Sequence, residues 1–67
     1  MKEMSKKNEK IHNKIQAIYN SGYVLEAVEI AVLENIGWSI TSLHETPAKE
    51  LVKYVNRLYK KYNCDES

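Results

Sequence analysis

The segment from Tyr23 to Ile36 constrains the fold more than any other part of the chain. Its sequence, YVLEAVEIAVLENI, places apolar residues on almost every side of a helix. A helix that is apolar on nearly all sides is typically buried between other elements. We therefore expect this segment to be the central helix of an all-α chain, over about residues 23–36.

A helical wheel divides the central segment into a broad apolar face and a narrower acidic one. The predicted core face consists of Val24, Leu25, Ala27, Val28, Ala31, Val32 and Ile36. The opposite face carries Glu26, Glu29 and Glu34, with Ile30 and Leu33 between them. The central helix thus has two surfaces, and the acidic one requires its own explanation.

Two interpretations of the acidic face remain open. In the first, the helix is sandwiched between two others, and Ile30 and Leu33 are buried with the rest. In the second, both residues are exposed in a monomer and form an interface framed by Glu26 and Glu29, because apolar residues ringed by charge are typical of binding surfaces. The second interpretation predicts a homodimer or a protein partner at Glu26, Glu29, Ile30 and Leu33.

A first helix is expected over about residues 5–20. The apolar residues of this stretch recur at spacings of four and three: Ile11, Ile15 and Ile18. This spacing places them on one helical stripe. Gly22 follows and suits the left-handed conformation that commonly ends a helix. The short connection predicts that the first and central helices are antiparallel neighbours.

The end of the central helix is ambiguous in the sequence. Asn35 falls within the predicted apolar face, where a buried amide would need hydrogen-bond partners, so we expect the helix to end near Ile36. A helix that continues through Gly37 costs only about 1 kcal/mol relative to alanine, so this alternative stays open. Residues 38–44 are then expected to form a short packed segment, with Trp38 at the core or its rim.

A third helix is predicted over about residues 47–62. Thr46 is expected to be its N-cap and Pro47 its first residue, where the missing N–H costs nothing. Its apolar stripe is Ala48, Leu51, Val52, Val55, Leu58, Tyr59 and Tyr62. Its basic face, a candidate surface for an acidic protein or for nucleic acid, is Lys49, Lys53, Tyr54, Arg57, Lys60 and Lys61. The alternative is that this face is an ordinary solvated helix surface without a binding role.

The size of the chain favours self-association. At 67 residues, folding buries only about 60% of the surface of the unfolded chain, so an isolated core is marginal. One cysteine and two histidines supply neither an internal disulfide nor a recognisable metal site. A homodimer is the expected source of additional stability.

Charge is segregated along the chain although the net charge is only +1. Residues 1–20 hold five lysines against two glutamates, residues 21–48 hold four glutamates and no lysine or arginine, and residues 49–61 hold five cations against one glutamate. A net charge near zero disfavours a protein that wraps nucleic acid. The basic segments still allow local contacts with phosphates.

The sequence contains no catalytic or metal-binding constellation. His44 and Glu45 are adjacent on a predicted loop, and Cys64 has no histidine near it in sequence, so neither suggests an active site. A helix-turn-helix motif fits badly, because its recognition segment, residues 39–46, would hold no lysine or arginine to contact phosphates. We expect no enzyme, no cofactor and no metal.

The sequence-based prediction is a single small helical domain of three helices, with flexible ends at residues 1–4 and 63–67. No apolar run is long enough for a membrane span or a signal peptide, so a cytoplasmic protein is expected. The excess of lysine over arginine suggests an AT-rich source, such as a low-GC bacterium or its phage. The predicted function is a non-enzymatic homodimer that regulates or inhibits a macromolecular partner by protein–protein binding. The alternative is a small nucleic-acid-binding protein that uses the basic face of the third helix.

Overall fold

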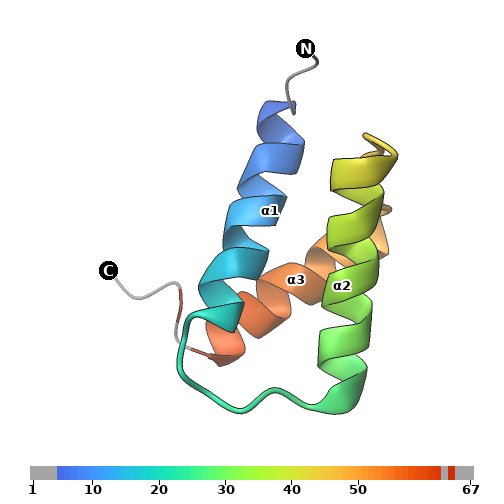
Figure 1. Cartoon of the computed structure of the whole chain (residues 1–67). Helices are drawn as coiled ribbons and strands as arrows, with labels where there is room; N and C mark the ends of the chain where they lie inside the picture. Colours follow the sequence, from blue (N-terminus) through green and yellow to red (C-terminus); the bar gives the residue numbers. More distant parts are fainter. Residues whose placement is uncertain (1–4, 63, 65–67) are drawn as a thin grey trace.

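The chain folds into helices joined by short connections, as Figure 1 shows. The computed structural model describes residues 5–62 and 64, and in this part of the chain the helices are α1 (Lys6–Tyr19), α2 (Ala27–Ser42) and α3 (Lys49–Lys61), with no strand. α1 and α2 lie side by side and antiparallel, and α3 crosses one side of the pair (Figure 1). The prediction of an all-α chain with three helices is confirmed.

The core lies where the three helices meet. Among the described residues, nine apolar side chains that are each at most 8% exposed form it: Ile11, Ile15, Ile18, Leu33, Ile36, Ile40, Val55, Leu58 and Tyr62. Each helix contributes one stripe of these residues. No helix in the described part of the chain is both long and apolar enough to cross a membrane.

α1 follows the prediction closely. The side chain of Ser5 accepts the backbone N–H of Asn8 at 3.2 Å, which satisfies a donor that the first helical turn leaves free. The connection after the helix contains Gly22 at φ +88°, in the left-handed region that glycine adopts without strain. The observed bounds agree with the predicted 5–20 to within one residue at each end.

α2 begins four residues later than predicted. Glu26 is still extended, with ψ at 154°, and helical geometry starts at Ala27. The backbone N–H of Glu26 donates to Oε1 of Glu29 at 3.0 Å, which caps the first turn of α2. Val24, which was predicted in the core, lies in the extended connection and is 93% exposed.

α2 also continues through Gly37 to Ser42, so the predicted end at Ile36 and the separate packed segment 38–44 are wrong. Continuation places Ile40 in the core at 0% exposure. Full burial of such a side chain contributes roughly 1.5–3 kcal/mol, more than the cost of about 1 kcal/mol for a glycine within a helix. The amide of Asn35 is exposed, so the burial cost that predicted an early end does not arise.

The largest correction concerns the side of α2 that faces the core. Ile36 points inward as predicted, together with Leu33 and Ile40, whereas Val28, also on the predicted core face, is 59% exposed. Trp38 is 57% exposed and lies outside the core. α2 is therefore turned so that much of the predicted core face meets solvent.

α3 starts two residues after the predicted position, with Ala48 as N-cap in place of Thr46. The residues before it complete the reversal from α2, and His44 takes a left-handed φ of 56°. The backbone oxygen of Glu45 accepts a hydrogen bond from Nδ2 of Asn8 at 3.2 Å, which ties this connection to α1. Pro47 therefore belongs to the connection and not to the first helical turn.

The predicted flexible ends, 1–4 and 63–67, lie outside the described residues except at Cys64. Cys64 is half-buried, and its N–H donates to the backbone oxygen of Tyr59 at 2.8 Å. Its Sγ lies 3.5 Å from the backbone oxygen of Ala17. This residue thus packs against α1 directly after α3.

Candidate interaction surfaces

Glu29 lies inside the fold and not on an open acidic face. It is 4% exposed, and its Oε2 lies 2.8 Å from Nζ of Lys61 at the end of α3. Its Oε1 accepts hydrogen bonds from the hydroxyl of Tyr62 and from the N–H of Glu26. One carboxylate therefore joins the start of α2 to the end of α3.

These contacts fix the ionisation of the three side chains. The hydrogen bond from Lys61, followed by those from Tyr62 and the Glu26 backbone, lowers the pKa of Glu29 from 4.5 to about 2. The same carboxylate raises the pKa of Lys61 and of Tyr62. A carboxylate that stays ionised throughout the neutral range is poorly suited to general acid–base catalysis, so a structural role fits this cluster.

The predicted interface strip on α2 is not exposed in the folded chain. Leu33 is 0% exposed and Glu29 is 4% exposed, because α2 turns both toward the core and α3. The burial of Leu33 agrees with the first of the two interpretations of this face and contradicts the second. The expected exposure of Glu29 was wrong. Ile30 is half-buried and Glu26 is exposed, and their contact with a partner stays a prediction.

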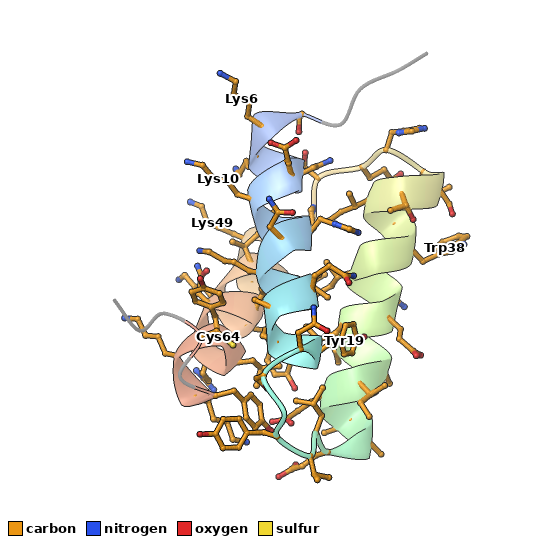
Figure 2. The ribbon with its side chains drawn as sticks, turned by 60° about the vertical axis from the view of Figure 1, so that its left-hand side comes forward. Lys6, Lys10, Tyr19, Trp38, Lys49 and Cys64 are labelled. Carbon is orange, nitrogen blue, oxygen red and sulfur yellow. The ribbon has the colours of Figure 1, made fainter. Side chains whose placement is uncertain are left out.

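The opposite side of α2 carries an exposed row that we call the outer row. It consists of Val28, Ala31, Asn35 and Trp38, and all four residues are exposed. They follow one another at steps of three, four and three residues, which keeps them on one side of the helix. Figure 2 shows Trp38 pointing away from α1 and α3.

A groove follows each side of the outer row. The first, of about 350 Å³, is apolar and is lined by α2 residues and by Leu51 of α3, which is 37% exposed. The second, of about 300 Å³, lies between α1 and α2, and its lining includes His12, Tyr19 and Trp38. Burial, and then Glu34, raises the pKa of Tyr19 in this second groove. The outer row is thus a ridge between two hollows.

A second surface forms where α1 and α3 pack together. Nζ of Lys14 donates to Oδ1 of Asn56 at 2.6 Å and lies 5.5 Å from the ring centroid of Tyr59. On α1, three further lysines precede Lys14 by four, seven and eight residues: Lys10, Lys7 and Lys6. On α3, three lysines lie three, four and seven residues from Asn56: Lys53, Lys60 and Lys49. Helical periodicity therefore directs them to the same junction. We call this set the basic edge: Lys6, Lys7, Lys10, Lys14, Lys49, Lys53 and Lys60.

Figure 2 shows Lys6, Lys10 and Lys49 projecting from the same side of the molecule, opposite Trp38. All members of the basic edge except the half-buried Lys14 are exposed. The outer row and the basic edge thus occupy opposite sides of the fold.

The basic face predicted for the third helix is only partly retained. Lys49, Lys53 and Lys60 belong to the basic edge, and Arg57 is exposed beside Lys53, one helical turn further along α3. Lys61 is turned to Glu29 instead. Tyr54 was expected to be available for stacking, but it is half-buried and packs against the core.

The contribution of α1 to this surface was missed in the sequence. Lys6, Lys10 and Lys14 form a visible row with a spacing of four residues. Periodicity alone does not reveal that this row lies beside α3. The contact between Lys14 and Asn56 supplies that information.

The described residues offer no group of three or more His, Cys, Asp or Glu side chains that could hold a metal ion. His44 and Glu45 are exposed on the connection between α2 and α3. The chain matches no protein-family model, no curated protein and no solved structure.

Proposed function

We propose that this chain is a small non-enzymatic interaction protein that forms a homodimer through the outer row of α2. The exposed apolar ridge carries the proposal, with Val28 at 59% and Trp38 at 57% exposure on one helix. Clustered apolar exposure marks binding surfaces, and tryptophan is enriched at their energetic centres. The dimer would serve as a regulator or inhibitor by binding a macromolecular partner through its remaining surfaces.

A second copy of the chain suits this surface because the row has the same spacing in both directions. Two α2 helices packed antiparallel about a two-fold axis would place Val28 opposite Trp38 of the second copy. The same symmetry would place Ala31 opposite Asn35, where the small alanine side chain permits close approach. Steps of three and four residues are those of a helix-to-helix seam, and two-fold dimers are the commonest oligomers.

Charge and size also support this occupant. The four residues of the outer row carry no formal charge, so they would not themselves bring like charges together. The grooves on either side give the facing side chains room to interdigitate. A second copy would also enlarge a core that is small for an isolated domain.

Sedimentation equilibrium tests the proposal with two variants of the row and one matched control. Val28→Asp and Trp38→Ala are expected to sediment as monomers, because the first places a charge in the seam and the second removes its largest apolar side chain. Asn13→Asp adds the same charge as Val28→Asp at an exposed position on α1 and should sediment like the wild type. A monomeric wild type, or association that survives both substitutions, would refute the proposal.

Asn35 provides a sharper test of the same seam. A single buried asparagine in a helical seam fixes its register at a cost in stability. Asn35→Val should therefore tighten association and weaken the preference for one dimeric arrangement. Sedimentation equilibrium detects the first effect as stronger association and the second as the appearance of higher oligomers. Association no tighter than that of the wild type would place Asn35 outside the interface.

A further inference from the structure

The basic edge is a continuous surface supplied by two helices. Lys14, the last lysine of α1, donates to Asn56 of α3 at 2.6 Å. Cations extend from this junction along both helices, and successive steps of four residues along one helix advance by about 6 Å. Two rows of positive charge therefore meet along the packed junction of α1 and α3.

In the described part of the chain, no carboxylate forms an ion pair with a lysine of the basic edge. Glu9 and Glu50 are the acidic residues of α1 and α3, and the positions of neither match the helical repeat that aligns the lysines with Lys14 and Asn56. The other glutamates of the described chain belong to α2 and its connections. Glu9 lies three residues from Lys6 and Glu50 lies three residues from Lys53, but among the described residues neither forms an ion pair with a lysine of the basic edge.

The edge also lacks the apolar anchors of a protein-binding surface. The large apolar residues of α1 and α3 that reach the exposed class are Tyr19 and Leu51, each at 37%. Tyr19 lines the groove between α1 and α2, and Leu51 lines the apolar groove beside the outer row. Protein interfaces depend on such buried anchors, whereas contacts with phosphates require only positioned positive charge.

From this combination we infer that the basic edge binds the phosphate backbone of a nucleic-acid duplex. The aromatic ring at this edge, Tyr59, is half-buried, with Nζ of Lys14 over it at 5.5 Å. Proteins that bind single strands rely on open rings on which bases stack. Contacts with phosphates carry no sequence information, so binding through the edge is independent of sequence. The inference does not depend on self-association, because the outer row lies on the opposite side of the molecule (Figure 2).

Salt dependence gives the expected size of the effect. If about four phosphates are neutralised, the logarithm of the binding constant falls with the logarithm of salt concentration at a slope of about −3.6. A rise from about 50 to about 150 mM salt then weakens binding roughly 50-fold. Loss of one phosphate contact makes the slope shallower by about 0.9.

Fluorescence anisotropy with labelled duplexes of about 20 base pairs, one of DNA and one of RNA, measures this binding. Lys10→Gln on α1 and Lys53→Gln on α3 should each weaken binding and make the salt slope shallower. Gln16→Glu is the matched control, since it changes the net charge by the same amount on the other side of α1. It should retain wild-type binding. Either duplex supports the inference, and the one bound more tightly identifies the nucleic acid.

Four results would overturn the inference. The first is no binding to either duplex at about 50 mM salt. The second is an equal loss of duplex binding in Gln16→Glu, which would show that binding depends on the net charge and not on the basic edge. The third is tighter binding to a single strand or to polyglutamate than to a duplex, which would assign the edge to another partner. The fourth is an effect of Lys53→Gln without one of Lys10→Gln, which would remove α1 from the surface. The titration is repeated with Val28→Asp, the variant that is expected to be a monomer. Duplex binding by this variant is then measured independently of the dimer proposal.

Discussion

Truncation of two α2 residues on opposite sides of the helix tests how α2 is turned. Leu33 is 0% exposed and Val28 is 59% exposed. Leu33→Ala removes buried side-chain atoms and leaves a cavity, which typically costs about 2–5 kcal/mol. Val28→Ala removes atoms that are largely in water, and substitutions at such surface positions usually change stability by about 0.5 kcal/mol or less. From the sequence, Val28 was predicted in the core, and the burial of Leu33 was one of two interpretations that stayed open.

The expected difference is large compared with the stability of the molecule. At roughly 0.05–0.15 kcal/mol per residue, a chain of 67 residues unfolds with a free energy of about 3–10 kcal/mol. A loss of about 3 kcal/mol lowers the midpoint of thermal unfolding by roughly 12–24 °C in a domain of this size. Leu33→Ala should therefore be partly unfolded under conditions in which Val28→Ala is fully folded.

Urea and thermal unfolding followed by far-ultraviolet circular dichroism measure both effects. The experiment is run at low protein concentration and again at about tenfold higher concentration, because self-association through Val28 would add a concentration-dependent contribution. At low concentration, an equal or larger loss in Val28→Ala than in Leu33→Ala would refute the orientation of α2. A concentration dependence that is present in the wild type and reduced in Val28→Ala would agree with the proposed dimer.

Two further predictions concern acid stability and glycine geometry. Because the pKa of Glu29 is about 2 in the folded chain against an ordinary 4.5, its contribution to stability is complete above about pH 4.5 and is lost as the pH falls toward 2. Glu29→Gln should remove this part of the pH dependence of the thermal midpoint, and an unchanged acid profile would contradict the assignment. Gly37→Ala should raise the free energy of unfolding by up to about 1 kcal/mol, since an added Cβ meets no atom within 4 Å. Gly22→Ala should lower it because its φ of +88° strains alanine, and urea unfolding that ranks the two variants in the opposite order would contradict both.

α1 and α3 were predictable because each has one clear apolar stripe. Ile11, Ile15 and Ile18 are flanked mainly by polar residues, so the wheel of α1 has a single solution. In α3, Val55 and Leu58 likewise face the core opposite a cationic side. The error at the start of α3, where Thr46 was predicted as the cap, arose because the connection from α2 extends two residues further, to Ala48.

α2 was harder because apolar residues surround it. The wheel favoured the side with the larger number of apolar residues, many of them small. Of that side the core takes Ile36, and it also takes Leu33 and Ile40, which the wheel did not assign to it. It also takes the charged Glu29, which a polarity pattern always assigns to solvent. The burial of Glu29 depends on Lys61, 32 residues away along the chain. Sequence periodicity contains no information about such a pairing.

The candidate surfaces were predicted in part for the same reason. The cations of α3 were visible as a row, but the participation of α1 depends on the packing of Lys14 against Asn56. The apolar interface was sought between the glutamates of α2. Once Leu33 points inward, the exposed apolar side chains lie on the other side of the helix, at Val28 and Trp38.

Glu29 connects two segments that are distant in sequence, the first turn of α2 and the last turn of α3. Its Oε1 holds the first turn of α2 through Glu26, and its Oε2 holds the last turn of α3 through Lys61. Fraying of the C-terminal end of α3 would remove the anchor of the side chain that caps α2, so we expect the two ends to open together. Anything that draws Lys61 away from Glu29 thus loosens the beginning of α2, at the end of the outer row where Val28 lies.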